Sequence, residues 1–165
     1  MSDWAKYAEE RKNLNYYKKI KEYICNLPCN ESIMDVGCGG TDIVLTGEFK
    51  YRTVINKEKL NVIYPNTNVI IGNWLEVSVC KHEIVTCCQV LEHLKDNDIL
   101  PFIKKLKEKS KYLIVSVPYM WPKGFCEYHL QDPINEEKFF GWFGVESFQY
   151  DIVQDKTCKR LVALF

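Results

Sequence analysis

The feature that most constrains this chain is a short apolar run that ends at three closely spaced glycines. Residues 33–36 are Ile-Met-Asp-Val, and Gly37, Gly39 and Gly40 follow directly. Such a run predicts a buried strand, and glycines let the backbone turn tightly where a ligand approaches it closely. The sequence therefore predicts a ligand site at the end of a buried strand.

The residues around the glycines indicate which ligand this is. A dinucleotide loop has the spacing Gly-x-Gly-x-x-Gly, but here the third residue after Gly39 is Asp42, whose carboxylate would repel a pyrophosphate. The Asp-Val-Gly-Cys-Gly run at 35–39 resembles the first motif of the class I S-adenosylmethionine-dependent methyltransferases, whose cofactor carries a sulfonium and an ammonium group. That resemblance implies S-adenosyl-L-methionine as the cofactor, bound by Asp35, Gly37, Cys38 and Gly39.

Composition limits the class of protein. A chain of 165 residues predicts one domain, 1–165, without room for a separate substrate domain. The 22 basic and 22 acidic residues cancel, so the net charge gives no reason to expect nucleic acid or an anionic membrane as a partner. No leader pattern and no apolar run near the roughly 20 residues of a bilayer span is present, so we expect a cytoplasmic protein without a membrane partner. The sequence predicts no particular oligomeric state.

The pattern of apolar and turn residues predicts an α/β fold. Seven runs rich in apolar and β-branched residues predict strands at 33–36, 51–55, 68–71, 82–88, 112–117, 147–153 and 160–165. Strands separated by connectors predict parallel crossovers, whereas the last two are so close that they must form an antiparallel hairpin. We therefore expect a doubly wound, seven-stranded, mostly parallel sheet with a C-terminal antiparallel hairpin, the Rossmann-like methyltransferase fold. Helical periodicity predicts one N-terminal accessory helix within 1–28, a short helix after the glycines, and helices at 97–109 and 136–142.

The ends of the second and third strands bear on cofactor binding. The methyltransferase family usually has an acidic residue after the second strand that holds both ribose hydroxyls, but this chain has Asn56, with Glu58 two residues later. We expect weaker cofactor binding through the Asn56 amide, or Glu58 reaching in. The resemblance further implies that Asn73 meets the adenine amine and that Trp74 stacks on the ring, although a core position is an equally good interpretation of Trp74.

A second segment that resembles the family is the fourth strand with Val-Leu-Glu-His-Leu after it, at 90–94. We expect Gln89 to contact the cofactor and to begin a helix, on which Glu92 and His93 share its face as candidate catalytic residues. The arrangement Gln89, Glu92, His93 and distant His129 also echoes the magnesium ligands of the small-RNA 3′-terminal 2′-O-methyltransferases. Because an amide replaces the first carboxylate, we expect no metal, and a divalent ion stays the less favoured alternative.

The segment 119–133 contains many aromatic residues and turn residues after the fifth strand, which predicts an acceptor-side loop. We expect Tyr119, Trp121 and Tyr128 to contact the substrate and His129 to be the general base, because an imidazole titrates near neutrality. A purely structural His129, bonded to a loop carbonyl, is the alternative. The segment resembles a group of short bacterial and phage methyltransferases, several of which are associated with surface-polysaccharide modification.

These features together predict a methyltransferase that acts on a small-molecule or glycan-precursor acceptor, by O-methylation in polysaccharide biosynthesis. The lysines of 104–111 give the helix at 97–109 a basic face, which we interpret as a solvated surface rather than a nucleic-acid site. Two alternatives stay open. One is a metal-assisted RNA-end 2′-O-methyltransferase, and the other is a non-catalytic binding subunit that keeps the cofactor fold.

Overall fold

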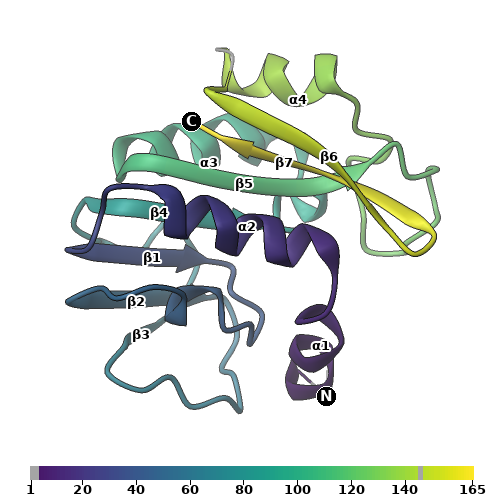
Figure 1. The fold of residues 1–165 in the computed structure, drawn as a ribbon. Coiled ribbons are helices and arrows are strands. Elements are labelled where there is room, and N and C mark those ends of the chain that lie inside the picture. Colours follow the sequence, from purple (N-terminus) through teal and green to yellow (C-terminus); the bar gives the residue numbers. More distant parts are fainter. Residues whose placement is uncertain (1–3, 145–146) are drawn as a thin grey trace.

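A single seven-stranded sheet organises the computed structural model, which describes residues 4–144 and 147–165 (Figure 1). The strand order is β3-β2-β1-β4-β5-β7-β6. The strands are β1 (Ser32–Val36), β2 (Tyr51–Asn56), β3 (Asn68–Ile71), β4 (His82–Cys88), β5 (Ser110–Tyr119), β6 (Gln149–Asp155) and β7 (Cys158–Leu164). This order confirms the predicted fold class.

The strand directions place the carboxyl ends of five strands at one edge. β1 to β5 are all parallel, while β7 runs antiparallel to β5 and to β6, which forms the predicted hairpin. From β1 the chain goes to β2 on one side, whereas β4 lies on the other side, so the strand order reverses between β1 and β4. Ligands of open α/β sheets bind outside the carboxyl ends at such a reversal. The glycines after β1 lie there.

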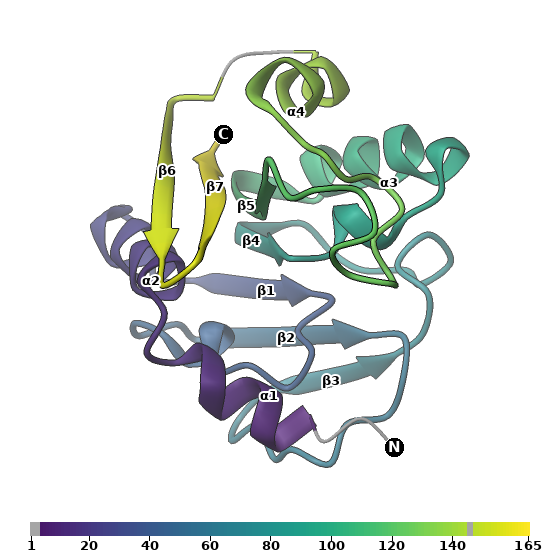
Figure 2. The same ribbon diagram turned by 90° about the vertical axis from the view of Figure 1, so that its right-hand side faces the viewer.

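In the described part of the chain, four α-helices and two 3₁₀ turns accompany the sheet. They are α1 (Trp4–Arg11), α2 (Asn15–Asn26), η1 (Ile43–Leu45), η2 (Leu91–His93), α3 (Asp96–Glu108) and α4 (Glu136–Phe143). α2 covers one face of the sheet, and α3 with α4 covers the other (Figures 1 and 2). Each face has its own core. The α2 core includes Ile33, Ile84 and Val162, and the opposite core includes Met34, Val85 and Leu161.

The predicted single helix within 1–28 is wrong, because the chain breaks after α1 and starts again at Asn15. The Asn15 backbone N–H donates to the Asp155 carboxylate, and its side chain donates to the Gln154 carbonyl at 2.9 Å. These contacts with the last two residues of β6 fix a new helix start, and asparagine is a weak helix former in any case. Residues 1–3 of the predicted helix lie outside the described residues.

The sheet is less completely covered than in a fully wound fold. The helix predicted after the glycines is only the 3₁₀ turn η1, and the connections on both sides of β3 contain no helix. Val69 and Ile71 of β3 are therefore 46% and 47% exposed. The predicted fifth strand also continues through Pro118 to Tyr119, since β7 pairs with it along that length.

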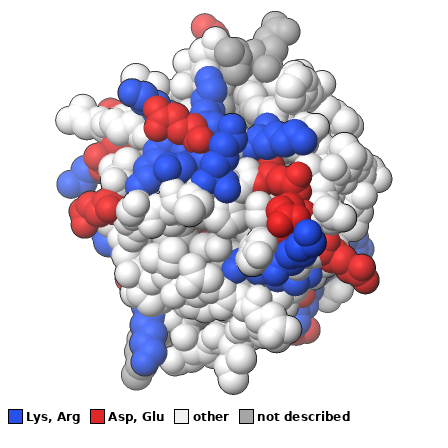
Figure 3. Space-filling view, turned by 90° about the vertical axis from the view of Figure 1, so that its left-hand side faces the viewer, with Lys and Arg blue, Asp and Glu red and all other residues white. Residues whose placement is uncertain are grey.

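Charged side chains of both signs are interspersed on the molecular face opposite the carboxyl edge (Figure 3). The Lys50–Glu31 ion pair, at 2.8 Å, lies at the amino ends of β1 and β2. Among residues 4–144 and 147–165, no helix combines the length and the apolar character that crossing a membrane requires.

Candidate active site

The loop after β1 depends on glycine geometry. Gly37, Gly39 and Gly40 have φ values of 75°, 51° and 80°, which lie in the left-handed region that favours glycine. The Gly37 N–H donates to the Ile55 carbonyl of β2 at 2.8 Å. A Cβ atom added to Gly37 would lie 2.4 Å from Cγ2 of Val90, so the segment after β4 packs directly on this loop. Conformation and space both require glycine at position 37.

Asp35 is the residue of β1 just before the last one, and it pairs with Thr86 of the neighbouring strand β4. Its side chain accepts hydrogen bonds from Oγ1 of Thr86 at 2.7 Å and from Oγ1 of Thr41 at 3.5 Å. The residue is 1% exposed, and this burial raises the pKa of the carboxyl group to about 7. A buried carboxylate without a nearby cation is unfavourable, so a cationic ligand beside it would stabilise the ionised form.

Asn56, at the end of β2, holds the loop from the other side. Its Oδ1 accepts from the Gly39 N–H at 3.3 Å, and its Nδ2 donates to the Glu58 carbonyl at 2.8 Å. A carboxylate in its place would keep the first bond and lose the second, because it has no N–H to donate. The two bonds thus explain why an amide, and not a carboxylate, stands at position 56. The Glu58 side chain is exposed at the same turn.

Two further contacts support the loop from α2 and from the segment before β3. Tyr64 donates to Sγ of Cys38 at 3.6 Å, and burial raises the pKa of that thiol to about 11. Tyr17 of α2 donates to the Asp42 carboxylate at 2.5 Å, which Lys21 also contacts at 2.9 Å. Tyr17 and Lys21 lie one helical turn apart on α2. The sequence did not indicate the contact of either residue with Asp42.

Asn73 and Trp74 follow β3, as predicted, but both side chains already have partners within the protein. The Asn73 side chain accepts from the Leu75 N–H at 3.2 Å, which closes the turn. The Trp74 indole is 3% exposed, donates to the Phe102 carbonyl at 3.3 Å, and packs under Lys105. The structure therefore places the Trp74 ring in the core against α3, and the predicted stacking on adenine stays untested.

Gln89 does not begin a helix, which corrects the prediction. Its φ is 58°, and only the 3₁₀ turn η2 follows. Its Nε2 donates to Oγ of Ser116 at 3.2 Å, and its Oε1 accepts from Nε of Arg160 at 3.1 Å. A left-handed residue other than glycine costs on the order of 1–3 kcal/mol and persists only when its surroundings enforce it. The Gln89 side chain thus points toward β5 and β7 and does not share a face with Glu92 and His93.

Glu92, His93 and His129 meet on the acceptor side of this turn. One ligand atom from each residue lies within 4.8 Å of those of the other two. Glu92 is 1% exposed, and neither carboxylate oxygen has a hydrogen-bond partner among the described residues. Burial raises the pKa of Glu92 to about 8. The structure therefore brings together three of the four predicted candidate ligands and leaves out Gln89.

Asp132 completes this group, and sequence analysis missed it. Its Oδ2 lies 2.7 Å from Nδ1 of His129, and the two side chains are 0% and 7% exposed. The carboxylate therefore favours the tautomer with the proton on Nδ1 and leaves Nε2 of His129 as an acceptor. The spacing His-x-x-Asp in a loop was the available sequence signal.

The loop predicted on the acceptor side lies at the carboxyl edge, together with α1 (Figure 2). The N–H groups of Leu130 and Gln131 donate to the Glu92 carbonyl at 2.7 and 3.2 Å, which closes the loop onto η2. The Trp121 ring stacks on His129, with centroids 5.4 Å apart. Of the loop residues predicted to contact the substrate, Trp121 thus lies beside the candidate base.

Tyr119 and Tyr128 occupy different surroundings. The Tyr119 hydroxyl donates to Glu136 of α4 at 2.8 Å, so its side chain points toward α4. Tyr128 is 73% exposed, and its carbonyl lies 3.0 Å from Nδ1 of His93. Tyr128 therefore orients His93 through its backbone, while its ring faces solvent.

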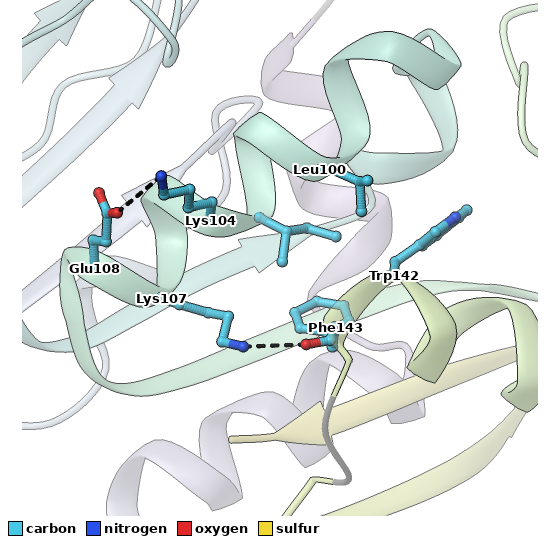
Figure 4. A pocket seen from close by; sticks show the side chains of 7 residues that line it. Leu100, Lys104, Lys107, Glu108, Trp142 and Phe143 are labelled. Carbon is cyan, nitrogen blue, oxygen red and sulfur yellow. Dashed lines mark hydrogen bonds and ion pairs between the residues drawn. The ribbon is translucent and has the colours of Figure 1, made fainter.

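A hollow of about 350 Å³ lies elsewhere, between α3 and α4 (Figure 4). Its walls are aliphatic side chains and stems together with Trp142 and Phe143, and Lys107 donates to the Phe143 carbonyl at 3.1 Å. None of its lining residues belongs to the glycine loop or to the Glu92 group. We assign no role to this hollow.

Comparison with known proteins identifies the fold. No protein-family model and no curated protein sequence matches this chain. Among solved structures, it is similar to the 1,6-didemethyltoxoflavin-N1-methyltransferase of Burkholderia thailandensis, solved with that compound and S-adenosylhomocysteine. The TM-score is 0.77 at 10% identity, over 99% of this chain and 84% of the other.

Two further solved structures have the same fold. Magnesium protoporphyrin IX methyltransferase from Synechocystis PCC 6803, with bound S-adenosylhomocysteine, has a TM-score of 0.67 at 15% identity, over 90% of this chain and 80% of the other. The methyltransferase domain of bacterial CtHen1-CN has a TM-score of 0.66 at 14% identity, over 91% and 98%. The chain therefore has the class I S-adenosylmethionine-dependent methyltransferase fold, and its candidate site lies at the edge where that fold binds ligands.

Proposed function

We propose that this chain is an S-adenosylmethionine-dependent methyltransferase. The fold supports this function, as do the glycine loop at the strand reversal and the buried Asp35 beneath it. Solved proteins of the same fold contain S-adenosylhomocysteine. In this proposal, Asp35, the backbone of 37–39, Asn56, Asn73 and Gln89 surround the cofactor, and the ribose contact comes from Asn56 or Glu58.

The reaction that the acceptor side supports best is O-methylation. A hydroxyl oxygen of the acceptor attacks the methyl carbon as the carbon–sulfur bond breaks, and the sulfonium becomes the neutral thioether of S-adenosylhomocysteine. The hydroxyl proton goes to Nε2 of His129. The protein's further contribution is alignment of the oxygen with the methyl group, which converts a bimolecular reaction into an effectively unimolecular one.

The single observation that carries this proposal is the buried His129–Asp132 contact of 2.7 Å. A general base needs a lone pair directed at the acceptor and a fixed orientation. Asp132 provides the orientation from Nδ1, and the Trp121 ring packs on the imidazole. The alternative was a purely structural His129 bonded to a loop carbonyl. The buried bond to Asp132 instead gives His129 the fixed orientation that a general base needs.

For the acceptor, we propose a small molecule or a glycan precursor with a free hydroxyl group. The loop over the site exposes apolar side chains at Met120, Phe125 and Tyr128, which are 53%, 61% and 73% exposed. Aromatic side chains pack well on the apolar faces of sugars and on planar rings. The similar solved proteins include enzymes named for small ring compounds.

The test combines cofactor binding with methyl transfer. Wild type and variants are incubated with S-adenosylmethionine and a panel of sugars, nucleotide-activated sugars and phenols, and S-adenosylhomocysteine formation is measured. His129→Ala should lose about a hundredfold to ten-thousandfold in rate while still binding S-adenosylhomocysteine. Asp132→Asn should lose less, but at least about tenfold.

The matched control is His82→Gln, which changes a histidine at the opposite end of β4 and should turn over normally. A wild-type rate in His129→Ala would overturn His129 as the base. Tight cofactor binding without transfer to any acceptor of the panel would favour the non-catalytic binding subunit.

A second candidate function is metal-assisted methyl transfer, which the Glu92 group favours. The bond from Nδ1 of His93 to the Tyr128 carbonyl and that from Nδ1 of His129 to Asp132 leave both Nε2 atoms as acceptors. Metal-ligating histidines usually donate their other N–H to a carbonyl or carboxylate in this way. The carboxylate of Glu92, which has no partner among the described residues, supplies the third ligand. Two imidazoles with one carboxylate suit a transition metal better than Mg²⁺.

Calorimetric titration with Mn²⁺ and with Zn²⁺ tests this second candidate. It predicts one site per chain, weakened at least about tenfold by Glu92→Gln. Glu31→Gln is the control, because it removes an exposed carboxylate at the amino edge. Equal metal affinity in wild type and Glu92→Gln would overturn the site. Loss of transfer in chelator with cofactor binding retained would support it, and an RNA acceptor would then be tested separately.

A further inference from the structure

Arg160 is a buried cation at the carboxyl edge that the proposed reaction does not use. It lies on β7 opposite Pro118 of β5 and is 5% exposed. Its Nη1 donates to Oδ2 of Asp155 at 3.0 Å, and its Nε donates to Oε1 of Gln89 at 3.1 Å. Buried arginines need such partners on several N–H groups. Asp155 balances the charge of Arg160, and Gln89 is its neutral second partner.

The Arg160 guanidinium lies over two aromatic rings. Its Cζ lies 4.5 Å from the centroid of Tyr16 on α2 and 5.3 Å from that of Trp121 in the acceptor-side loop. A guanidinium stacks on aromatic rings and donates in its own plane at the same time. Arg160 thus connects α2, the hairpin, the end of β4 and the acceptor-side loop.

Gln89 is the partner that leads toward the cofactor. Its backbone is left-handed, with φ of 58°, and three bonds hold it there: its side chain bonds to Arg160 and Ser116, and its N–H donates to the Ser116 carbonyl at 2.8 Å. The next residue, Val90, occupies the space beside Gly37 that a Cβ would need. The position of Val90 therefore depends on the Gln89 turn. The position of Val90 in turn limits the space beside the glycine loop, where the proposed cofactor would bind.

Trp121 is the partner that leads toward the acceptor. Its indole donates to the Lys159 carbonyl at 3.0 Å, and its ring stacks on His129 at an interplanar angle of 24°. We propose that Arg160 is a positioning residue that holds the Gln89 turn beside the glycine loop and the Trp121 ring against His129, so that the cofactor and acceptor sides are coupled through it. We call the contact of Arg160 with Gln89 the cofactor arm and its contact with Trp121 the acceptor arm. The cofactor arm rests on the proposed function.

A double-mutant cycle tests the cofactor arm without knowledge of the acceptor. The affinity for S-adenosylhomocysteine is measured by calorimetry in wild type, Arg160→Met, Gln89→Leu and the double variant. We expect each single change to weaken binding at least about fivefold, and the double variant to bind no more weakly than the weaker single one. Lys50→Met, which removes an exposed charge at the amino edge, is the control and should bind normally.

The acceptor arm has a spectroscopic readout at fixed pH. The chain has 3 histidines, so the imidazole signals of His129 and His82 can be compared by nuclear magnetic resonance. Arg160→Met should shift the His129 signals and leave those of His82, at the opposite end of β4, unchanged. A purely structural Arg160 would instead lower stability and shift both or neither.

Two results overturn the inference. One is an Arg160→Met variant that binds S-adenosylhomocysteine like wild type. The other is a double variant whose loss of affinity equals the product of the two single losses, because the two residues would then act independently. If Arg160→Met does not fold, Arg160→Lys carries the test, because a lysine keeps the charge but cannot bridge Asp155 and Gln89 with a planar fork. Arg160→Lys should then show the same loss in affinity and the same His129 shift. A wild type that binds no S-adenosylhomocysteine would refute the proposed function, while the histidine signals would still test the positioning by Arg160.

Discussion

The environments of single residues in the candidate site make the stability of the protein depend on pH. Asp35 is one such residue, because its carboxylate is buried under the glycine loop with a pKa raised to about 7. The folded protein therefore binds this proton more tightly than the unfolded chain does. The stability contributed by the protonated form is present at low pH and is lost as the pH rises through about 7.

Asp35→Asn should consequently raise the free energy of unfolding at pH 8 by at least about 1 kcal/mol, measured by urea titration. The same change should weaken binding of the cationic S-adenosylmethionine, since the negative charge beneath the loop is removed. A variant that is less stable than wild type at pH 8 would contradict the assigned environment. A variant with unchanged affinity would show that Asp35 does not contribute to cofactor binding.

His82, at the start of β4, provides the opposite case. Its Nε2 lies 3.1 Å from Oγ1 of Thr53, and burial lowers its pKa. The unfolded chain therefore binds the proton more readily, so stability is present above the ordinary pKa of about 6.5 and is lost as the pH falls.

His82→Gln should reduce the loss of stability between about pH 6.5 and pH 5, where one titrating group contributes at most about 1.4 kcal/mol per pH unit. Unfolding free energies at several pH values check this, and the comparison at pH 8 serves as the control. If the unfolding free energy of His82→Gln falls as steeply below pH 6.5 as that of wild type, groups other than His82 cause the loss of stability in acid.

The sequence identified most of the residues at the carboxyl edge but not how their side chains are used. Asp35, the glycines and Asn56 lie at strand ends, where apolar runs stop, and this position is visible in the sequence. Asp132 was missed because its contact with His129 depends on the conformation of their loop, which the bonds of Leu130 and Gln131 to the Glu92 carbonyl hold. The interior position of the Trp74 ring was not decided by the sequence, because an aromatic residue after a strand suits either a core or a ligand.

At the level of elements, α4 shows how local signals fix a helix. The Asn135 side chain accepts from the Lys138 N–H at 2.9 Å, and Gly144 ends the helix with φ of 64°. Phe139 and Phe143 of this helix are buried against the sheet. Cap, glycine and apolar spacing agree, so α4 was predicted within one residue.

Asn135→Ala should lower the free energy of unfolding by about 1 kcal/mol, because the capped N–H loses its partner. Asn97→Ala, an exposed change in the first turn of α3, is the matched control and should have no comparable cost. Urea denaturation of the two variants in parallel measures the difference. Equal stability of Asn135→Ala and wild type would show that the cap is dispensable.

Elsewhere, contacts with residues distant in the sequence determined where helices begin and end. α1 and α2 are separate because Asn15 contacts Asp155, which lies 140 residues away. The Gln89 turn replaces the expected helix start because Ser116 and Arg160 hold its side chain. Periodicity over neighbouring residues contains no information about such partners, so the sequence predicted the strands well and these two breaks wrongly.

In the whole molecule, the parallel half of the sheet and the C-terminal hairpin contribute to one site. The glycine loop, Asp35 and Asn56 belong to β1 and β2, whereas Glu92, His129 and Arg160 follow or flank β4, β5 and β7. The strand reversal between β1 and β4 brings these groups together. In the proposed function, the cofactor lies on one side of Gln89 and the acceptor on the other.

The central claim is that this edge binds S-adenosylmethionine, and calorimetric titration of the purified protein with S-adenosylmethionine and S-adenosylhomocysteine tests it most directly. The titrations are run with and without Mg²⁺ or Mn²⁺. The account predicts saturable binding at one site per chain, weakened in Asp35→Asn. Absence of binding of either compound under all of these conditions would contradict it, and the methyltransferase function would then be rejected despite the fold.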